Sequence, residues 1–202
     1  MEFQDVLARR RMVRNYTSDP IDSDSLDRIT AAALRAPSAG FSQGQAVVTV
    51  TDPATREKIA AAAGEGEYVS SGFDPWISRA PAHIVICVSE EAYHRRYQME
   101  DKLTDDGSEI EWPVPYWWVD AGASLMAVLL AAVDEGLAAG FLGVHAIDDL
   151  RRELAIPAEY WPIGVVTVGY PAPDRRSSSL DLGRRPPSAV LHKERWTTGE
   201  EL

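Results

Sequence analysis

The chain has 202 residues, a hydrophobic fraction of 45% and a formal net charge of −11, a composition that predicts one ordinary globular domain. So negative a charge argues against nucleic acid as a partner, because contacts to phosphate dominate that kind of affinity. The start lacks the basic and apolar segments of a signal peptide, and the longest apolar run, residues 121–133, is too short to cross a bilayer, so we expect a cytoplasmic protein with no membrane segment.

The predicted elements are helices interspersed with a few strands. In the first third of the chain we expect a helix over 2–12, a helix over 24–35 capped by Asp22 or Ser23, a loop over 37–45, a strand over 46–51 and a helix over 52–64. A mobile segment over 64–76, a strand over 82–89 and a long connection over 98–118 follow. The last part should contain a buried helix over 119–137, a short strand over 140–143, a short helix over 147–154 and a strand over 164–170.

These strands are too few for a doubly wound sheet, and no G-x-G-x-x-G motif follows a strand. The fold class is therefore α+β, with a small sheet packed among long helices in a single domain over residues 1–202. The tail from about residue 171 is too polar to build a core of its own. We expect it to wrap over another surface, such as a second subunit.

The residues that serve most often as nucleophiles or metal ligands show no catalytic pattern. The one cysteine, Cys87, lies in an apolar run typical of a strand, which favours a packed thiol over a nucleophile. The histidines, His83, His94, His145 and His192, lack the short spacings that build a zinc site. We expect no metal and no catalytic side chain of the Ser-His-Asp or Cys-His kind.

Arginine is concentrated near both ends of the chain. Four of the 20 lysines and arginines lie between residues 9 and 14, and Arg184 and Arg185 form a second group. Guanidinium groups suit a bidentate grip on phosphate oxygens, although a charge run on its own is also typical of a solvated face. Two such groups in so acidic a chain favour a buried phosphate clamp.

The order of five segments resembles the FMN-dependent nitroreductase superfamily. These segments read RRRMVRNY, LRAPSAGFSQGQ, DAGASLMAVLLAAVDEGLAAGFLG, PIGVVTVGYP and GRRPPSAVLHKERW. The resemblance implies a nitroreductase-like α+β fold with a small central mixed sheet among long helices. It also implies a homodimer with FMN sites at the subunit interface and C-terminal tails exchanged between subunits.

The resemblance also implies which residues bind the cofactor. The ribityl phosphate of FMN would be held by Arg10, Arg11 and Arg14, together with Arg184 or Arg185 from the tail of the other subunit. The loop along the flavin ring would consist of Ser38, Ala39, Gly40, Ser42 and Gln43. Backbone N–H groups near flavin N5 would come from Leu142 and Gly143. The residues alone leave simple turns open as an alternative for both segments.

Two positions depart from the pattern of the superfamily. Met12 stands where many relatives have a serine that bonds the phosphate, and Phe41 stands where many have an asparagine near the polar edge of the ring. Each change removes a hydrogen bond and leaves weakened or altered flavin binding open. We expect Phe41, Tyr116 and Trp117 to line the substrate pocket, while core packing remains the alternative for the aromatic stretch over residues 112–118.

The activity that the resemblance implies is an FMN-dependent oxidoreductase of nitroreductase type. Electrons would pass from NADH or NADPH through FMN to a small nitro-, quinone- or similar acceptor, with the chemistry carried by the flavin and not by a side chain. Two alternatives stay open at this point. One is a protein that binds or sequesters flavin or deazaflavin without turnover, and the other is a specialised biosynthetic flavin oxidase.

Overall fold

The computed structural model describes residues 1–196, so the last six residues of the expected 1–202 domain lie outside the described part. A four-stranded sheet forms its centre, with the strand order β1-β2-β4-β3. The strands are β1 (Gln45–Val50), β2 (Ala82–Val88), β3 (Ala138–Leu142) and β4 (Trp161–Gly169). Each neighbouring pair is antiparallel. The α+β class is confirmed, but the expected mixed character of the sheet is limited to one isolated parallel bridge, between Met12 and Ala139.

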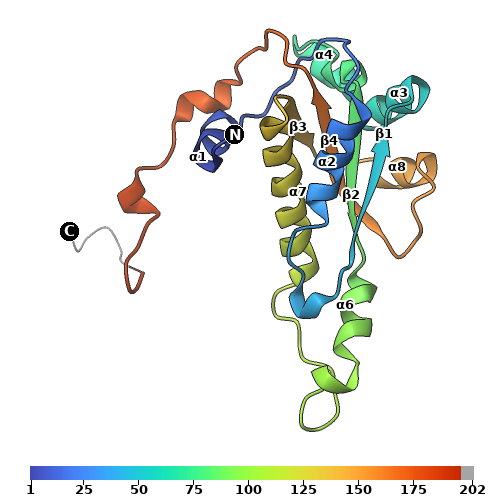
Figure 1. Cartoon of the computed structure of the whole chain (residues 1–202), viewed down its shortest axis with the longest axis vertical. Coiled ribbons are helices and arrows are strands. Elements are labelled where there is room, and N and C mark those ends of the chain that lie inside the picture. The colour runs from blue at the N-terminus through green and yellow to red at the C-terminus, as the bar shows by residue number, and fades with distance from the viewer. Residues whose placement is uncertain (197–202) are drawn as a thin grey trace.

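The helices cover both faces of this sheet (Figure 1). The α-helices are α1 (Phe3–Arg9), α2 (Ser23–Ala33), α3 (Pro53–Ala62), α4 (Glu65–Ser70), α5 (Trp76–Arg79), α6 (Glu90–Tyr97), α7 (Tyr116–Asp134) and α8 (Ile147–Glu153). Short 3₁₀ turns are η1 (Ala39–Phe41), η2 (Glu100–Lys102), η3 (Ser178–Leu182) and η4 (Pro187–Ala189). The predicted cap of α2 is Asp22, whose carboxylate accepts the backbone N–H of Ser25 at 2.8 Å.

Successive side chains of β2 point to opposite faces of the sheet, so the strand contributes to the core on both faces. Ile84 and Ile86 pack toward α2 and α7, whereas Val85 and Cys87 pack toward α3, α5 and α8. Cys87 is buried in this core, which confirms the prediction of a packed thiol, and burial raises the pKa of the thiol to about 12. All seven residues of β2 are buried, so this strand ties the two halves of the core together.

The apolar helix α7 packs across one face of the sheet, yet part of it stays exposed. Trp118, Val119 and Met126 are 42%, 53% and 46% exposed, so the chain alone buries this helix less completely than its composition predicted. α7 is long and apolar enough to cross a membrane, but the core helix of a soluble protein meets the same criterion of length and composition.

Residues 64–76, which the sequence predicted to be a mobile segment, contain helical turns with local contacts. They contain α4 and the start of α5, and the carboxylate of Glu65 accepts the backbone N–H groups of Ile77 and Ser78 at 2.6 and 2.9 Å. The ring of Tyr68 meets the buried Trp76 edge to face at 5.6 Å between centroids. These contacts join α4 to α5, although the Gly- and Ser-rich sequence of the segment suggested a loop without tertiary contacts.

His83 on β2 makes the stability of this core dependent on pH. Burial lowers its pKa to about 4, and its Nε2 lies 2.7 Å from the carbonyl of Ile77. The unfolded chain therefore takes up a proton between pH 6.5 and 4 that the folded chain rejects, so the free energy of unfolding falls as the pH drops. We expect this group to account for a loss of about 3 kcal/mol over that window.

Denaturant unfolding of the wild type and of His83→Gln at several pH values measures this contribution. The variant, whose amide does not titrate, is expected to lose about 3 kcal/mol less than the wild type between pH 6.5 and 4. Parallel curves for the two proteins over that window would show that His83 is not the group responsible.

Candidate functional site

The arginine-rich segment, residues 9–14, runs along the edge strand β3. The backbone N–H of Val13 donates to the carbonyl of Ala139 at 3.1 Å, and the carbonyl of Val13 accepts the hydroxyl of the buried Tyr16 at 2.9 Å. Gly140 makes this approach possible, because the carbonyl of Val13 occupies the position that a Cβ at Gly140 would need. The sheet thus fixes the backbone from which the arginine side chains project.

The start of the C-terminal tail is bonded to the same segment. The N–H of Ala172 donates to the carbonyl of Asn15 at 3.1 Å, and the Asn15 amide donates to the carbonyl of Pro173 at 2.7 Å. The backbone N–H of Arg14 donates to Oδ2 of Asp174 at 2.8 Å. These bonds bring arginines from the two ends of the chain to one place.

A pocket of about 540 Å³ lies where the two segments meet, a size typical of ligand sites. Its lining consists of Arg10, Arg11, Met12, Arg14, Asp174, Arg175, Arg176, Ser177, Ser179, Leu180 and Arg184. All four predicted phosphate-binding positions are therefore represented here, by Arg10, Arg11, Arg14 and, of the two tail arginines, Arg184. We call this the arginine pocket.

Four of the arginines in this pocket have guanidinium groups that are free within the described residues. Within residues 1–196, the side chains of Arg10, Arg11, Arg14 and Arg184 make no hydrogen bond or ion pair, in contrast to Arg96, which grips Asp101 at 2.7 Å. Unpaired guanidinium groups that converge on a hollow are the chemistry of a site for a multiply charged anion. The arginine pocket can thus hold a phosphate.

The remaining charged groups of the pocket are partly engaged. Arg175 donates to the carbonyl of Ser71 at 2.9 Å and lies over the ring of Phe73, and Arg176 pairs with Asp181 at 3.2 Å. Oδ1 of Asp174 is buried and has no hydrogen-bond partner within the described chain. A hydroxyl donor on a ligand would satisfy that oxygen.

The two tail arginines of the predicted clamp lie in different places. Arg184 lines the pocket of its own chain, and the exchange of tails with a second subunit stays a prediction. Arg185 does not line this pocket and donates to the carbonyl of Ala189 at 2.9 Å. Sequence reasoning missed Arg175 and Arg176 because they lie in a tail that looked uniformly polar.

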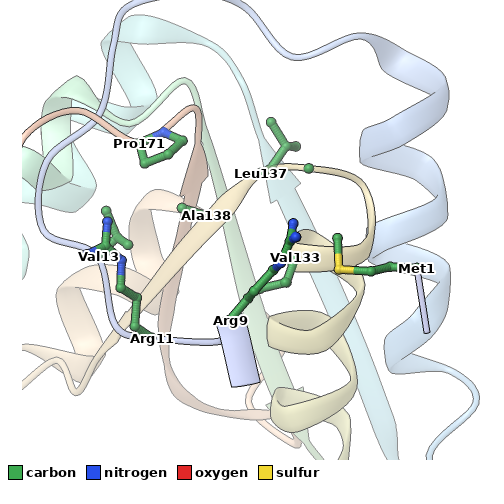
Figure 2. Close-up of a pocket in the computed structure, with 9 residues that line it drawn as sticks. Met1, Arg9, Arg11, Val13, Val133, Leu137, Ala138 and Pro171 are labelled. Atoms are coloured by element: carbon green, nitrogen blue, oxygen red, sulfur yellow. The ribbon is translucent and has the colours of Figure 1, made fainter. Parts of the chain in front are cut away.

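A smaller hollow of about 160 Å³ adjoins this region (Figure 2). Arg9, Arg11 and Met1 line it together with residues at the start of β3. Arg11 lines both cavities, whereas Arg9 lines the smaller cavity and not the arginine pocket. The run of arginines after α1 therefore divides between two hollows.

The loop over residues 38–43 has an unusual backbone. Gly40, Phe41 and Gln43 have φ values of 60°, 59° and 52°, in the left-handed region that bulky residues such as phenylalanine rarely adopt. The hydroxyl of Ser42 donates to the carbonyl of Ala39 at 2.6 Å, and Ser38 Oγ accepts the Gln43 N–H at 3.0 Å. Such strain is common at functional sites, so the loop remains a candidate for ligand binding.

Sequence reasoning missed Asp120, the buried carboxylate beneath this loop. Its Oδ2 accepts the backbone N–H of Ala39 at 2.9 Å and the hydroxyl of Tyr93 at 2.8 Å. The signal was present, because Asp120 is the only charged residue in the apolar stretch from 112 to 133.

Leu142 and Gly143, the other predicted ring contacts, lie at the end of β3. The side chain of Leu142 is buried, whereas Gly143 is exposed, and nothing lies within 4 Å of a Cβ built there. The backbone at this point therefore borders open space. Neither residue lines the arginine pocket.

The aromatic stretch before α7 is split between core and surface. Trp117 is 6% exposed and packs with Tyr93 and Trp112, so its side chain takes the core alternative and does not line an open pocket. Tyr116 and Phe41 are 44% and 74% exposed and remain available to a ligand.

The chain matches the model of the Nitroreductase family over residues 7–170. It is 31% identical over 203 aligned residues to FMN reductase (NAD(P)H) of Bacillus subtilis, covering 97% of this chain and 75% of that protein.

Solved structures are similar over almost the whole chain. A hypothetical oxidoreductase from Bacillus subtilis superposes with a TM-score of 0.76 at 28% identity, covering 100% of this chain and 77% of the other. A nitroreductase family protein from Streptococcus pneumoniae has a TM-score of 0.74 at 19% identity, covering 95% and 100% of the two chains. The second likeness supports the fold alone.

Proposed function

Because the chain belongs to the nitroreductase family and is an NAD(P)H-dependent flavin oxidoreductase with FMN as cofactor, we propose that its electron acceptor is a small nitro-, quinone- or similar compound. We propose further that it works as a cytoplasmic homodimer. The observation that carries the proposal is that arginines from both ends of the chain, without partners among residues 1–196, converge on one pocket.

The arginine pocket fits the phosphate end of FMN. The phosphate oxygens would be bound by donors of Arg10, Arg11, Arg14 and Arg184, which have no partner in the described part of the chain. Oδ1 of Asp174, which lacks a partner there as well, offers an acceptor to a hydroxyl of the ribityl chain. Met12, which also lines the pocket, contributes no hydroxyl, and the surplus of arginine compensates for the serine that many relatives have there.

The remaining predicted contacts would hold the ring system. They are Ser38, Ala39, Gly40, Ser42 and Gln43 in the strained loop, and the backbone N–H groups of Leu142 and Gly143. When bound, FMN supplies the two-electron redox chemistry. The chain's own groups bind and orient the cofactor, and the exposed Phe41 and Tyr116 shield the acceptor site from water and favour flat, apolar acceptors.

The proposed homodimer accounts for apolar surface that the single chain leaves uncovered. Phe3 and Leu7 on α1 are 61% and 43% exposed, Trp118, Val119 and Met126 on α7 are exposed as well, and α1 contacts α7. Exposed apolar side chains on two contacting helices are typical of a subunit interface.

Anaerobic reduction of the FMN-loaded protein tests the proposed activity. We expect NADH or NADPH to bleach the visible flavin spectrum, and a nitroaromatic or a quinone to restore it within the turnover time. A flavin that stays oxidised with both nucleotides would contradict turnover and leave a binding protein. Reoxidation by oxygen but not by either acceptor would contradict the proposed acceptor class and favour an oxidase.

A further inference from the structure

We propose that Asp120, acting with Tyr93, is a positioning residue that holds the loop over residues 38–43 in its binding conformation against the flavin ring. The inference rests on the proposed function, because it assigns this loop to the cofactor. It adds two side chains on α6 and α7 that neither line the arginine pocket nor belong to the predicted contacts.

One oxygen of Asp120 joins three separate parts of the fold. Oδ2 accepts the N–H of Ala39 from the loop and the hydroxyl of Tyr93 from α6, at 2.9 and 2.8 Å, while Asp120 itself lies on α7. Asp120 is 7% exposed and Tyr93 is fully buried. Hydrogen bonds to a buried carboxylate are among the stronger ones in proteins, and leaving it unpaired is costly.

The loop needs such an anchor because its backbone is strained. Phe41 and Gln43 have left-handed φ values without being glycine, a conformation that persists only where surrounding structure imposes it. A second anchor acts one residue beyond Ala39, since Arg96 on α6 donates to the carbonyl of Gly40 at 2.9 Å. Asp120 and Arg96 thus fix consecutive residues at the start of the strained stretch.

Helix α6 forms the base on which the loop lies. In addition to Tyr93 and Arg96 it supplies Tyr97, whose ring stands 2.6 Å from the position of a Cβ built at Gly40. The loop backbone therefore rests directly on the helix, with no room for a side chain at Gly40. A shift of Ala39 and Gly40 would move Phe41 and Ser42 together with them.

The hydroxyl of Tyr93 stays protonated over the working pH range. Burial and the hydrogen bond to Asp120 raise the pKa of Tyr93, so its hydroxyl remains a donor. Asparagine at position 120 would retain an acceptor oxygen for both donors while removing the negative charge. The pair of variants Asp120→Ala and Asp120→Asn therefore separates the hydrogen bonds from the charge.

The test uses the full chain carrying Asp120→Ala, Asp120→Asn or Tyr93→Phe, with Tyr68→Phe as the matched control. Tyr68 packs beside Phe73 and Trp76 on the other face of the sheet. Three quantities are measured: amide hydrogen exchange of the 38–43 peptide without FMN, the Kd for FMN, and the midpoint potential of bound FMN.

We expect Asp120→Ala to speed exchange in the 38–43 peptide by about tenfold or more and to raise the Kd for FMN by a similar factor. Tyr93→Phe speeds exchange and raises the Kd by smaller factors, and Tyr68→Phe changes neither the exchange rate nor the Kd. Asp120→Asn restores exchange and Kd to within about twofold of the wild type, because the amide oxygen still accepts from Ala39 and Tyr93. The midpoint potential of bound FMN then rises only to the extent that the lost negative charge acts on the reduced flavin.

Unchanged exchange in Asp120→Ala would overturn the inference whatever the protein binds. Faster exchange with an unchanged Kd would show that the loop does not position FMN, and would equally overturn it. Failure of the proposed function gives a different result, since the wild type itself would then fail to bind FMN while its 38–43 peptide remained protected.

Discussion

Replacing Arg10 and Arg14 together by alanine will weaken FMN binding by about 100-fold or more. Both side chains line the arginine pocket and lack partners within the described chain, so their hydrogen-bonding capacity is free for the phosphate. A hydrogen bond to a charged group contributes about 1.5–3 kcal/mol, and two lost together correspond to the stated change in Kd. Titration of the cofactor-free chain by flavin fluorescence measures it.

The matched control is the double variant Arg95→Ala, Arg152→Ala. It removes the same two charges, but from exposed ion pairs on α6 and α8 that contribute little to stability. We expect its Kd for FMN to stay within about threefold of the wild type. Equal loss of affinity in both double variants would mean that net charge, not the arginine pocket, governs binding.

Gly140→Ala will lower the free energy of unfolding by about 1–3 kcal/mol, the usual cost of forcing an extra group into a packed site. The new Cβ would stand where the carbonyl of Val13 lies, and close to the side-chain oxygens of Thr167 and Tyr16. The backbone must then move away from β3. Because Val13 is flanked by residues of the arginine pocket, FMN affinity should fall as well.

Gly66→Ala on α4 is the comparison for this variant, since nothing lies within 4 Å of a Cβ at Gly66. We expect it to be neutral or to stabilise by up to about 1 kcal/mol, as alanine does in a helix. Urea unfolding of the two variants measures both effects. A Gly140→Ala protein as stable as the wild type would show that the segment after α1 is not held by this close approach.

The elements that could be predicted are those whose signal is local. The strand β2 and the helix α7 are long apolar runs, and their predicted positions agree with the structure to within about three residues. The helices α4 and α6 were missed, because α6 is mostly polar and α4 contains glycine and serine. Both are stabilised by tertiary contacts, such as the burial of Tyr93, which no local pattern carries.

In the site too, residues with a local chemical signal could be predicted, whereas residues placed by long-range contacts could not. The arginines at both ends of the chain could be assigned to one pocket because their chemistry suggested a shared ligand, whereas the position of Arg184 relative to Arg185 depends on how the tail folds. Asp120 could not be assigned a role, since its partners Ala39 and Tyr93 lie 81 and 27 residues away. Long-range hydrogen bonds of this kind need coordinates.

The most direct test of the central claim, that the arginine pocket holds the phosphate of FMN, compares the Kd values of the wild-type chain for FMN and riboflavin. The two ligands differ only in the phosphate. We expect FMN to bind about 100-fold more tightly or better, with an advantage that shrinks as salt is added. Equal affinities at low salt would contradict the claim and would require another role for these arginines.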